Sequence, residues 1–156
     1  MKKNISLNVN GEARDLCIPP NETLLDTLRT EMFLTGSKQG CDTGGCGCCT
    51  VLIDGESRYS CMTYTVTVGE RNVTTIEGIS EGETLDKLQQ AFVDTGAVQC
   101  GYCTCGMIMS AKQLLSTNPN PSESEIRKGL SGNLCRCTGY HKIVEAVKVA
   151  AQSEVK

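Results

Sequence analysis

The fold of this chain is decided by the ten residues Gly40-Cys-Asp-Thr-Gly-Gly-Cys-Gly-Cys-Cys49. Within them, Cys41, Cys46 and Cys49 form a C-x4-C-x2-C array, and Cys61 follows after eleven further residues. A 2Fe-2S cluster needs four thiolates aimed at one small inorganic body, and three can come from one loop only if its backbone wraps tightly. The glycines supply that freedom and let main-chain N–H groups approach the sulfurs. The spacing therefore predicts a 2Fe-2S site, and we call residues 40–49 the cluster loop.

Two other interpretations of the loop fit less well. Zinc sites usually pair two short Cys-x2-Cys knuckles or mix cysteine with histidine, and a four-residue spacing among glycines suits them poorly. A disulfide knot requires an oxidising compartment, whereas the first ten residues alternate apolar and polar side chains and do not resemble an export signal. We therefore expect a cytoplasmic chain, in which eleven cysteines favour metal ligation.

Charge and hydropathy exclude two classes of partner. A net charge of −3 gives no basic surface for nucleic acid. No window approaches the roughly 18 apolar residues of a membrane span, so no span is expected. The length allows either one ordinary domain or two small domains of about 75 residues each. Domains that small bury too little apolar surface unaided, so two metal sites would help to stabilise them.

The first half has the pattern of a small sheet with one helix. Alternation over residues 5–9, followed by Asn10-Gly11, predicts a hairpin whose second strand contains Cys17 as a half-buried residue. A helix is expected from an N-cap at Thr23 to Gly36. Further strands are expected at 50–54, 58–61 and 73–76, and the second of these returns Cys61 to the cluster loop.

The second half is expected to be helical. A polar linker at 80–83 precedes four apolar stripes with helical spacing, at 85–92, 107–115, from Ser122 onward, and 143–151. Ser122 and Glu125 have the Ser-x-x-Glu form of a capping box. These stripes predict the core of a four-helix bundle.

Two pairs of cysteines lie between these helices, Cys100 with Cys103 and Cys135 with Cys137. Antiparallel packing would bring both turns to one end of the bundle. Taken alone, this spacing leaves zinc and iron open, and the cluster loop shifts the balance to iron. Rieske-type ligation is excluded because it needs two histidines, and the sole histidine, His141, is expected as an ordinary residue at the start of the fourth helix.

Three motifs together resemble the small iron–sulfur subunit of the molybdenum hydroxylases, the family of xanthine dehydrogenase. They are Gly40-Cys-x4-Cys-Gly-x-Cys-Thr-Val51, Gln99-Cys-Gly-Tyr-Cys-Thr104 and Gly132-Asn-Leu-Cys-Arg-Cys-Thr-Gly-Tyr140. The resemblance covers nearly the whole chain. It implies an α+β fold, with a plant-type ferredoxin domain of β-grasp form over 1–79 and a helical 2Fe-2S-binding domain, a four-helix bundle, over 80–156.

The resemblance also implies cofactors and partners. Two 2Fe-2S clusters would lie in this chain, the molybdenum-bearing molybdopterin in a large partner subunit, and FAD in another partner subunit. The first cysteine set, on the flavin side, would be Cys41, Cys46, Cys49 and Cys61. The second cysteine set, on the molybdenum side, would be Cys100, Cys103, Cys135 and Cys137. Gln99 and Cys137 would contact the molybdopterin, although an ordinary solvated amide is the alternative for Gln99.

The expected function is passive conduction of single electrons from the molybdenum centre to flavin, with no substrate site or catalytic residue in this chain. The family implies a purine or N-heteroaromatic substrate, with nicotinate dehydrogenase as the favoured member. A free-standing double-cluster ferredoxin and a zinc-stabilised binding module are the alternatives. The sequence departs from the family at Cys48 and Cys105, which are expected as buried small hydrophobes or redox liabilities, and Arg136 is expected either to offset cluster charge or to be solvated.

Overall fold

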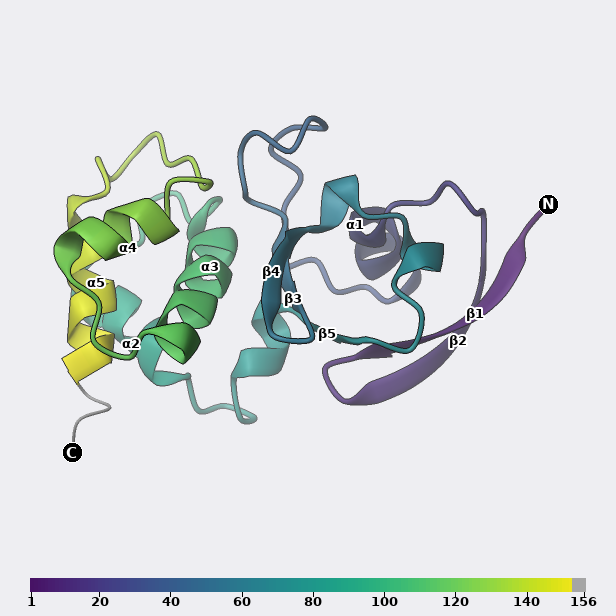
Figure 1. The fold of residues 1–156 in the computed structure, drawn as a ribbon, viewed down its shortest axis with the longest axis horizontal. Helices are drawn as coiled ribbons and strands as arrows, with labels where there is room; N and C mark the ends of the chain where they lie inside the picture. Colours follow the sequence, from purple (N-terminus) through teal and green to yellow (C-terminus); the bar gives the residue numbers. More distant parts are fainter. Residues whose placement is uncertain (153–156) are drawn as a thin grey trace.

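The computed structural model describes residues 1–152 and contains a five-stranded mixed sheet beside a group of helices (Figure 1). The strands are β1 (Lys3–Val9), β2 (Glu12–Ile18), β3 (Thr50–Ile53), β4 (Glu56–Tyr59) and β5 (Asn72–Thr74). Their order is β2-β1-β5-β3-β4. Only the β1–β5 pair is parallel among these strands.

Both predicted hairpins are confirmed. Val9 pairs with Glu12 across the Asn10-Gly11 turn, and Ile53 pairs with Glu56 in the second hairpin. The second hairpin's return strand starts two residues earlier than expected, at Glu56. The prediction for Cys17 was wrong: it lies in β2 but is exposed, because its neighbours on either side turn toward the core and the thiol faces outward.

The helix of the first half begins as predicted and ends early. The Thr23 side chain accepts a hydrogen bond from the Asp26 main chain, which caps α1 (Leu24–Asp26), and the helix continues as a π-helical turn (Thr27–Glu31). It ends at Met32, not at Gly36, because Phe33 adopts a positive φ of 58°. Apolar side chains of this helix and of the sheet form one core, which comprises Leu7, Val9, Leu24, Leu28, Val51, Ile53, Val68 and Val73.

The four predicted helices of the second half are present. They are α2 (Lys87–Asp94), α3 (Thr104–Thr117), α4 (Glu123–Gly129) and α5 (His141–Gln152). The Ser122–Glu125 capping box is formed in both directions. Leu85, which we placed on the first helix, lies outside it and is exposed, because Asp86 is the N-cap and forms its own capping box with Gln89.

Short 3-10 turns connect the strands, at Ser60–Met62, Thr65–Thr67 and Ile76–Ile79. The last of them starts where we expected strand, and Ile76 and Ile79 pack against the helical core. Helix α3 lies between the two halves, packed against β3 and β4 on one side and the other helices on the other (Figure 1). The α+β architecture is therefore confirmed, and the cluster loop lies next to the N-terminal end of α3.

None of the helices in residues 1–152 is long and apolar enough to cross a membrane. The domain boundary at 79/80 stays a prediction, and the last four residues of the second predicted domain lie outside the described part of the chain.

Candidate metal centres

The first cysteine set is brought together by the cluster loop and the turn after β4. Cys49 Sγ lies 3.3 Å from Cys61 Sγ. The Cys46 thiol lowers the pKa of Cys41, so these two side chains are also neighbours. Cys61 reaches the loop because the β3–β4 hairpin reverses the chain directly after Cys49, as the sequence indicated. The four thiols therefore form two neighbouring pairs.

The backbone of the cluster loop is arranged to stabilise a thiolate. The pKa of Cys41 is lowered to about 6, chiefly by a hydrogen bond from the Thr43 main chain and then by the Cys46 thiol. The loop also leaves little room for a side chain at Gly40, because a Cβ at that position would lie only 3.0 Å from Cys46 Sγ. Main-chain N–H groups thus approach the sulfur, as expected for a loop that cradles an anionic cluster.

The second cysteine set lies at one end of the helical bundle, as predicted. Cys103 is the N-cap residue of α3, and Cys135 and Cys137 lie in the turn before α5. Cys137 Sγ lies 3.5 Å from Cys100 Sγ. Burial raises the pKa of Cys103 to about 12, and the neighbouring Cys135 thiol contributes to this rise. This set also forms two pairs, each containing one cysteine from each turn.

The arrangement in pairs fits a dinuclear cluster better than a single ion. A tetrahedral zinc site requires all four ligands around one point. A 2Fe-2S cluster held by four cysteines takes two thiolates on each iron, which matches two adjacent pairs. Both cysteine sets therefore fit a 2Fe-2S cluster in donor chemistry and in grouping.

Comparison with known proteins leads to the same conclusion. Residues 7–73 match the family described as "2Fe-2S iron-sulfur cluster binding domain", and residues 75–148 match "[2Fe-2S] binding domain". The nicotinate dehydrogenase small FeS subunit of Eubacterium barkeri is 49% identical over 97% of this chain and 96% of its own length. The nicotine 6-hydroxylase small subunit of Paenarthrobacter nicotinovorans is also 49% identical, over 92% of this chain and 86% of its own.

A solved structure agrees over nearly the full length. It is quinoline 2-oxidoreductase from Pseudomonas putida 86, with a TM-score of 0.94 and 44% identity over 97% of this chain and 95% of that chain. The chain belongs to the small iron–sulfur subunits of the molybdenum hydroxylases. Its cofactors are two 2Fe-2S clusters and its role is electron transfer within an oxidoreductase, so the zinc module is set aside.

The second cysteine set of this iron–sulfur subunit has an open side and a closed side. Cys100 and Cys137 are exposed, and the preceding residue Gln99 is exposed beside them. Cys103 is buried and Cys135 is half-buried. One pair therefore faces the surface of the molecule, while the other faces the interior and the cluster loop.

The two cysteines that depart from the family pattern meet between the two sets. Cys48 and Cys105 are both buried, and the Cys105 thiol donates a hydrogen bond to the Cys48 carbonyl oxygen over 3.2 Å. Burial raises the pKa of Cys48 to about 12, with the nearby Cys46 adding to the shift. Both are buried as small hydrophobes would be, and no pattern in the sequence indicated that these two residues contact each other.

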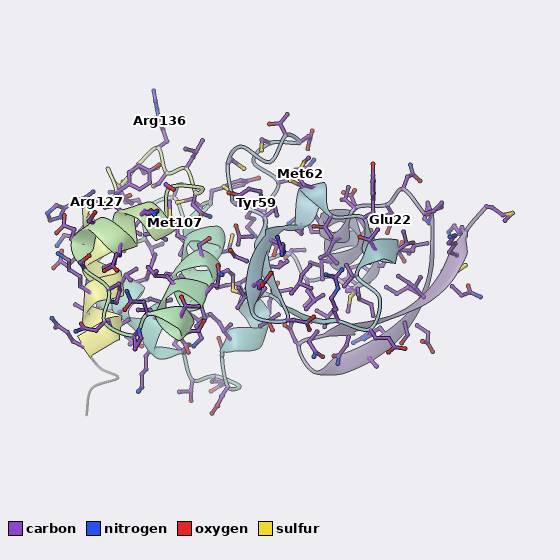
Figure 2. The ribbon with its side chains drawn as sticks, viewed as in Figure 1. Glu22, Tyr59, Met62, Met107, Arg127 and Arg136 are labelled. Carbon is purple, nitrogen blue, oxygen red and sulfur yellow. The ribbon has the colours of Figure 1, made fainter. Side chains whose placement is uncertain are left out.

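Arg136 lies between two members of the second set, but its side chain is exposed and points away from the rest of the chain (Figure 2). This favours the solvated or interface interpretation over charge compensation.

Sequence reasoning missed two residues that join the halves of the subunit. Tyr59 donates its hydroxyl hydrogen to the Gly132 carbonyl oxygen over 2.9 Å, and the Asn133 amide binds the Gly47 carbonyl. Their partners lie more than seventy positions away, so no local pattern indicated them.

Proposed function

We propose that this subunit conducts single electrons from a molybdopterin-bound molybdenum centre in a large partner subunit to an FAD-binding partner subunit. The first cysteine set, Cys41, Cys46, Cys49 and Cys61, holds the cluster on the flavin side. The second set, Cys100, Cys103, Cys135 and Cys137, holds the cluster on the molybdenum side. A bound 2Fe-2S cluster supplies one-electron redox chemistry, so two such steps serve one substrate oxidation.

The observation that carries this proposal is the exposure of Cys100 and Cys137 together with Gln99. Thiolate ligands at the surface place a redox centre within reach of a partner's cofactor, and an adjacent exposed amide can hydrogen-bond that cofactor. We therefore assign Gln99 and Cys137 as the contacts to molybdopterin. The chain's own contribution is to orient the ligands, to donate main-chain hydrogen bonds to Cys41 and to exclude water from the inner pair.

The substrate class we propose is an N-heteroaromatic compound, with nicotinate favoured over a purine. The support is that several relatives with 44–49% identity are named for nicotinate, nicotine or quinoline, whereas another at 46% is named a probable xanthine dehydrogenase subunit. The substrate pocket would lie in the large subunit. We further propose that the chain divides into domains at 79/80 and works in the cytoplasm, where its eleven cysteines stay reduced unless they bind metal.

The test is isolation of the native complex through a tag on this chain. We expect molybdenum, FAD and iron to co-purify, and the complex to reduce an artificial acceptor with nicotinate faster than with xanthine. The variant Gln99→Ala should keep its iron and lose activity, whereas Gln90→Ala, which changes an exposed-face glutamine of α2, should lose neither. A chain that purifies alone with both clusters would support a free-standing ferredoxin instead.

A further inference from the structure

Three successive carbonyl groups of the cluster loop accept hydrogen bonds from the helical half. The Leu134 main-chain N–H donates to the Cys46 oxygen over 2.9 Å. The Asn133 side-chain amide donates to the Gly47 oxygen over 2.9 Å, and the Cys105 thiol donates to the Cys48 oxygen. These contacts form a strip of polar bonds between the two cysteine sets.

The Leu134 bond connects the sets by the shortest chemical path in this strip. Cys46 belongs to the first set, and Leu134 is bonded directly to Cys135 of the second set. The path from one ligand to the other therefore consists of covalent bonds and a single hydrogen bond, without a gap filled by solvent. Its length depends on how firmly residues 134–135 are held against the cluster loop.

Asn133 is the residue that holds them there. Its side chain is buried, with 3% exposure, and it has partners in both halves of the molecule. The amide nitrogen lies 2.9 Å from the Gly47 oxygen and 3.3 Å from Thr50 Oγ1, while the amide oxygen accepts from Ser110 Oγ over 2.7 Å. Its carbonyl oxygen also accepts a bond from the Tyr140 hydroxyl. A buried amide satisfied on both sides costs free energy to displace, so its position is well defined.

We propose that Asn133 is a positioning residue for electron transfer between the two clusters. By binding the Gly47 carbonyl oxygen, it keeps the hydrogen bond between Leu134 and Cys46 intact. In each transfer, the centre held by the second set is oxidised by one electron and the centre held by the first set is reduced by one. No proton moves in this step. The inference rests on the ligand assignment of the proposed function and adds a residue that binds neither cluster.

The experiment uses the isolated full-length chain with both clusters, in the variants Asn133→Leu and Asn133→Ala. Leucine has a similar size and cannot bond Gly47, while alanine removes the amide without adding bulk. The matched control is Thr65→Val, which removes the buried hydrogen bond between Thr65 and Thr27 and leaves every bond of Asn133 in place. Iron content and the electron paramagnetic resonance (EPR) signal of each cluster are measured first, in singly reduced samples.

The deciding readouts are the spin–spin splitting between the two reduced clusters and the rate of electron equilibration between them after flash reduction. Both Asn133 variants should keep their iron, show a smaller splitting and equilibrate about tenfold more slowly, as small displacements of reacting groups produce. Thr65→Val should keep the splitting and the rate of the unaltered chain. Unchanged splitting and rate in an iron-replete Asn133 variant would overturn the positioning role, as would an equal loss in Thr65→Val.

The two proposals fail in different ways. If the unaltered chain showed fewer than two cluster signals, the ligand assignment and the positioning role would both fall. If the unaltered chain showed two coupled clusters but no large subunit co-purified, only the assembly in the proposed function would fall. If Asn133→Leu did not retain iron, Asn133→Ala would give the same test with a smaller side chain.

Discussion

Gly106, in the first turn of α3, packs directly against the carbonyl oxygen of Gly47 in the cluster loop, so that a methyl group at Gly106 would overlap that oxygen. Gly47 has a positive φ of 71°, and a side chain there would meet the Gly132 carbonyl and Asn133. Two glycines thus allow backbone to approach backbone where the two halves join. This contact brings the end of α3 that carries Cys103 up to the loop that carries Cys46.

We expect Gly106→Ala to force α3 away from the cluster loop. The overlap is with backbone, which cannot rotate aside as a side chain can, so the free energy of unfolding should fall by about 1–3 kcal/mol. Chemical denaturation of the cluster-loaded chain, followed by visible absorption and circular dichroism, measures this loss. The spin–spin splitting between the reduced clusters should also shrink.

Gly129→Ala is the matched control for that substitution. Gly129 is the last residue of α4, and a methyl group there would meet the flexible end of the Leu114 side chain at 3.0 Å. Alanine favours the helical backbone by up to about 1 kcal/mol over glycine, which offsets the tight contact. If Gly129→Ala lowered the free energy of unfolding as much as Gly106→Ala, the contact between α3 and the cluster loop would have no special requirement for glycine.

Tyr140→Phe should weaken the second cysteine set. The Tyr140 hydroxyl accepts a 2.9 Å hydrogen bond from the Cys135 main-chain N–H and donates to the Asn133 carbonyl. Removal of the hydroxyl leaves a partly buried N–H group without its partner, which costs about 1–3 kcal/mol. We expect the second cluster to be lost first during titration with a chelator, as followed by its EPR signal.

Tyr64→Phe alters a tyrosine that is 54% exposed and remote from the second set, and it should leave that titration unchanged. Equal chelator sensitivity in the two variants would contradict the role assigned to the Tyr140 hydroxyl.

The local features of the fold follow from the sequence because their signals are local. The Asn10-Gly11 hairpin, the Thr23 cap and the Ser122 capping box each involve residues within a few positions of one another. Leu85 was misplaced although a local signal existed, since Asp86 with Gln89 forms an Asp-x-x-Gln cap that stops the helix short of it. The end of the first-half helix at Met32 was missed because nothing in the sequence marks Phe33 for a positive φ.

The candidate site also contains residues that the sequence predicted and one that it did not. The grouping of the cysteines into two sets was predicted from spacing and family motifs, and the structure places Cys49 beside Cys61 and Cys100 beside Cys137. Asn133 was not identified as a joining residue, because its partners Gly47 and Ser110 come from distant parts of the chain. An Asn in a loop is typical of turn chemistry, so only the packed structure shows that this one is buried between the halves.

Cys48→Ala should leave two clusters, because the proposed ligand set does not include this thiol. Cys48 packs among the buried residues of the helical core, and alanine fills nearly the same space. Iron content and both EPR signals should match the unaltered chain, whereas Cys46→Ala should lose the first signal. If Cys48→Ala lost a cluster, the ligand would be Cys48 and the assignment of the cluster loop would need revision.

Removal of iron should unfold the first half or leave it loosely packed. The cluster loop contains no helix or strand, and the core beneath the sheet is built from a few aliphatic side chains. In a half this small, metal binding contributes a large share of the folding free energy. We expect the chain freed of iron by a chelator to lose its cooperative thermal transition, and anaerobic reconstitution with iron and sulfide to restore it. A cooperative melt that persists in the iron-free chain would mean that the hydrophobic core alone specifies the fold, and that the cluster loop is held by its hydrogen bonds to the helical half.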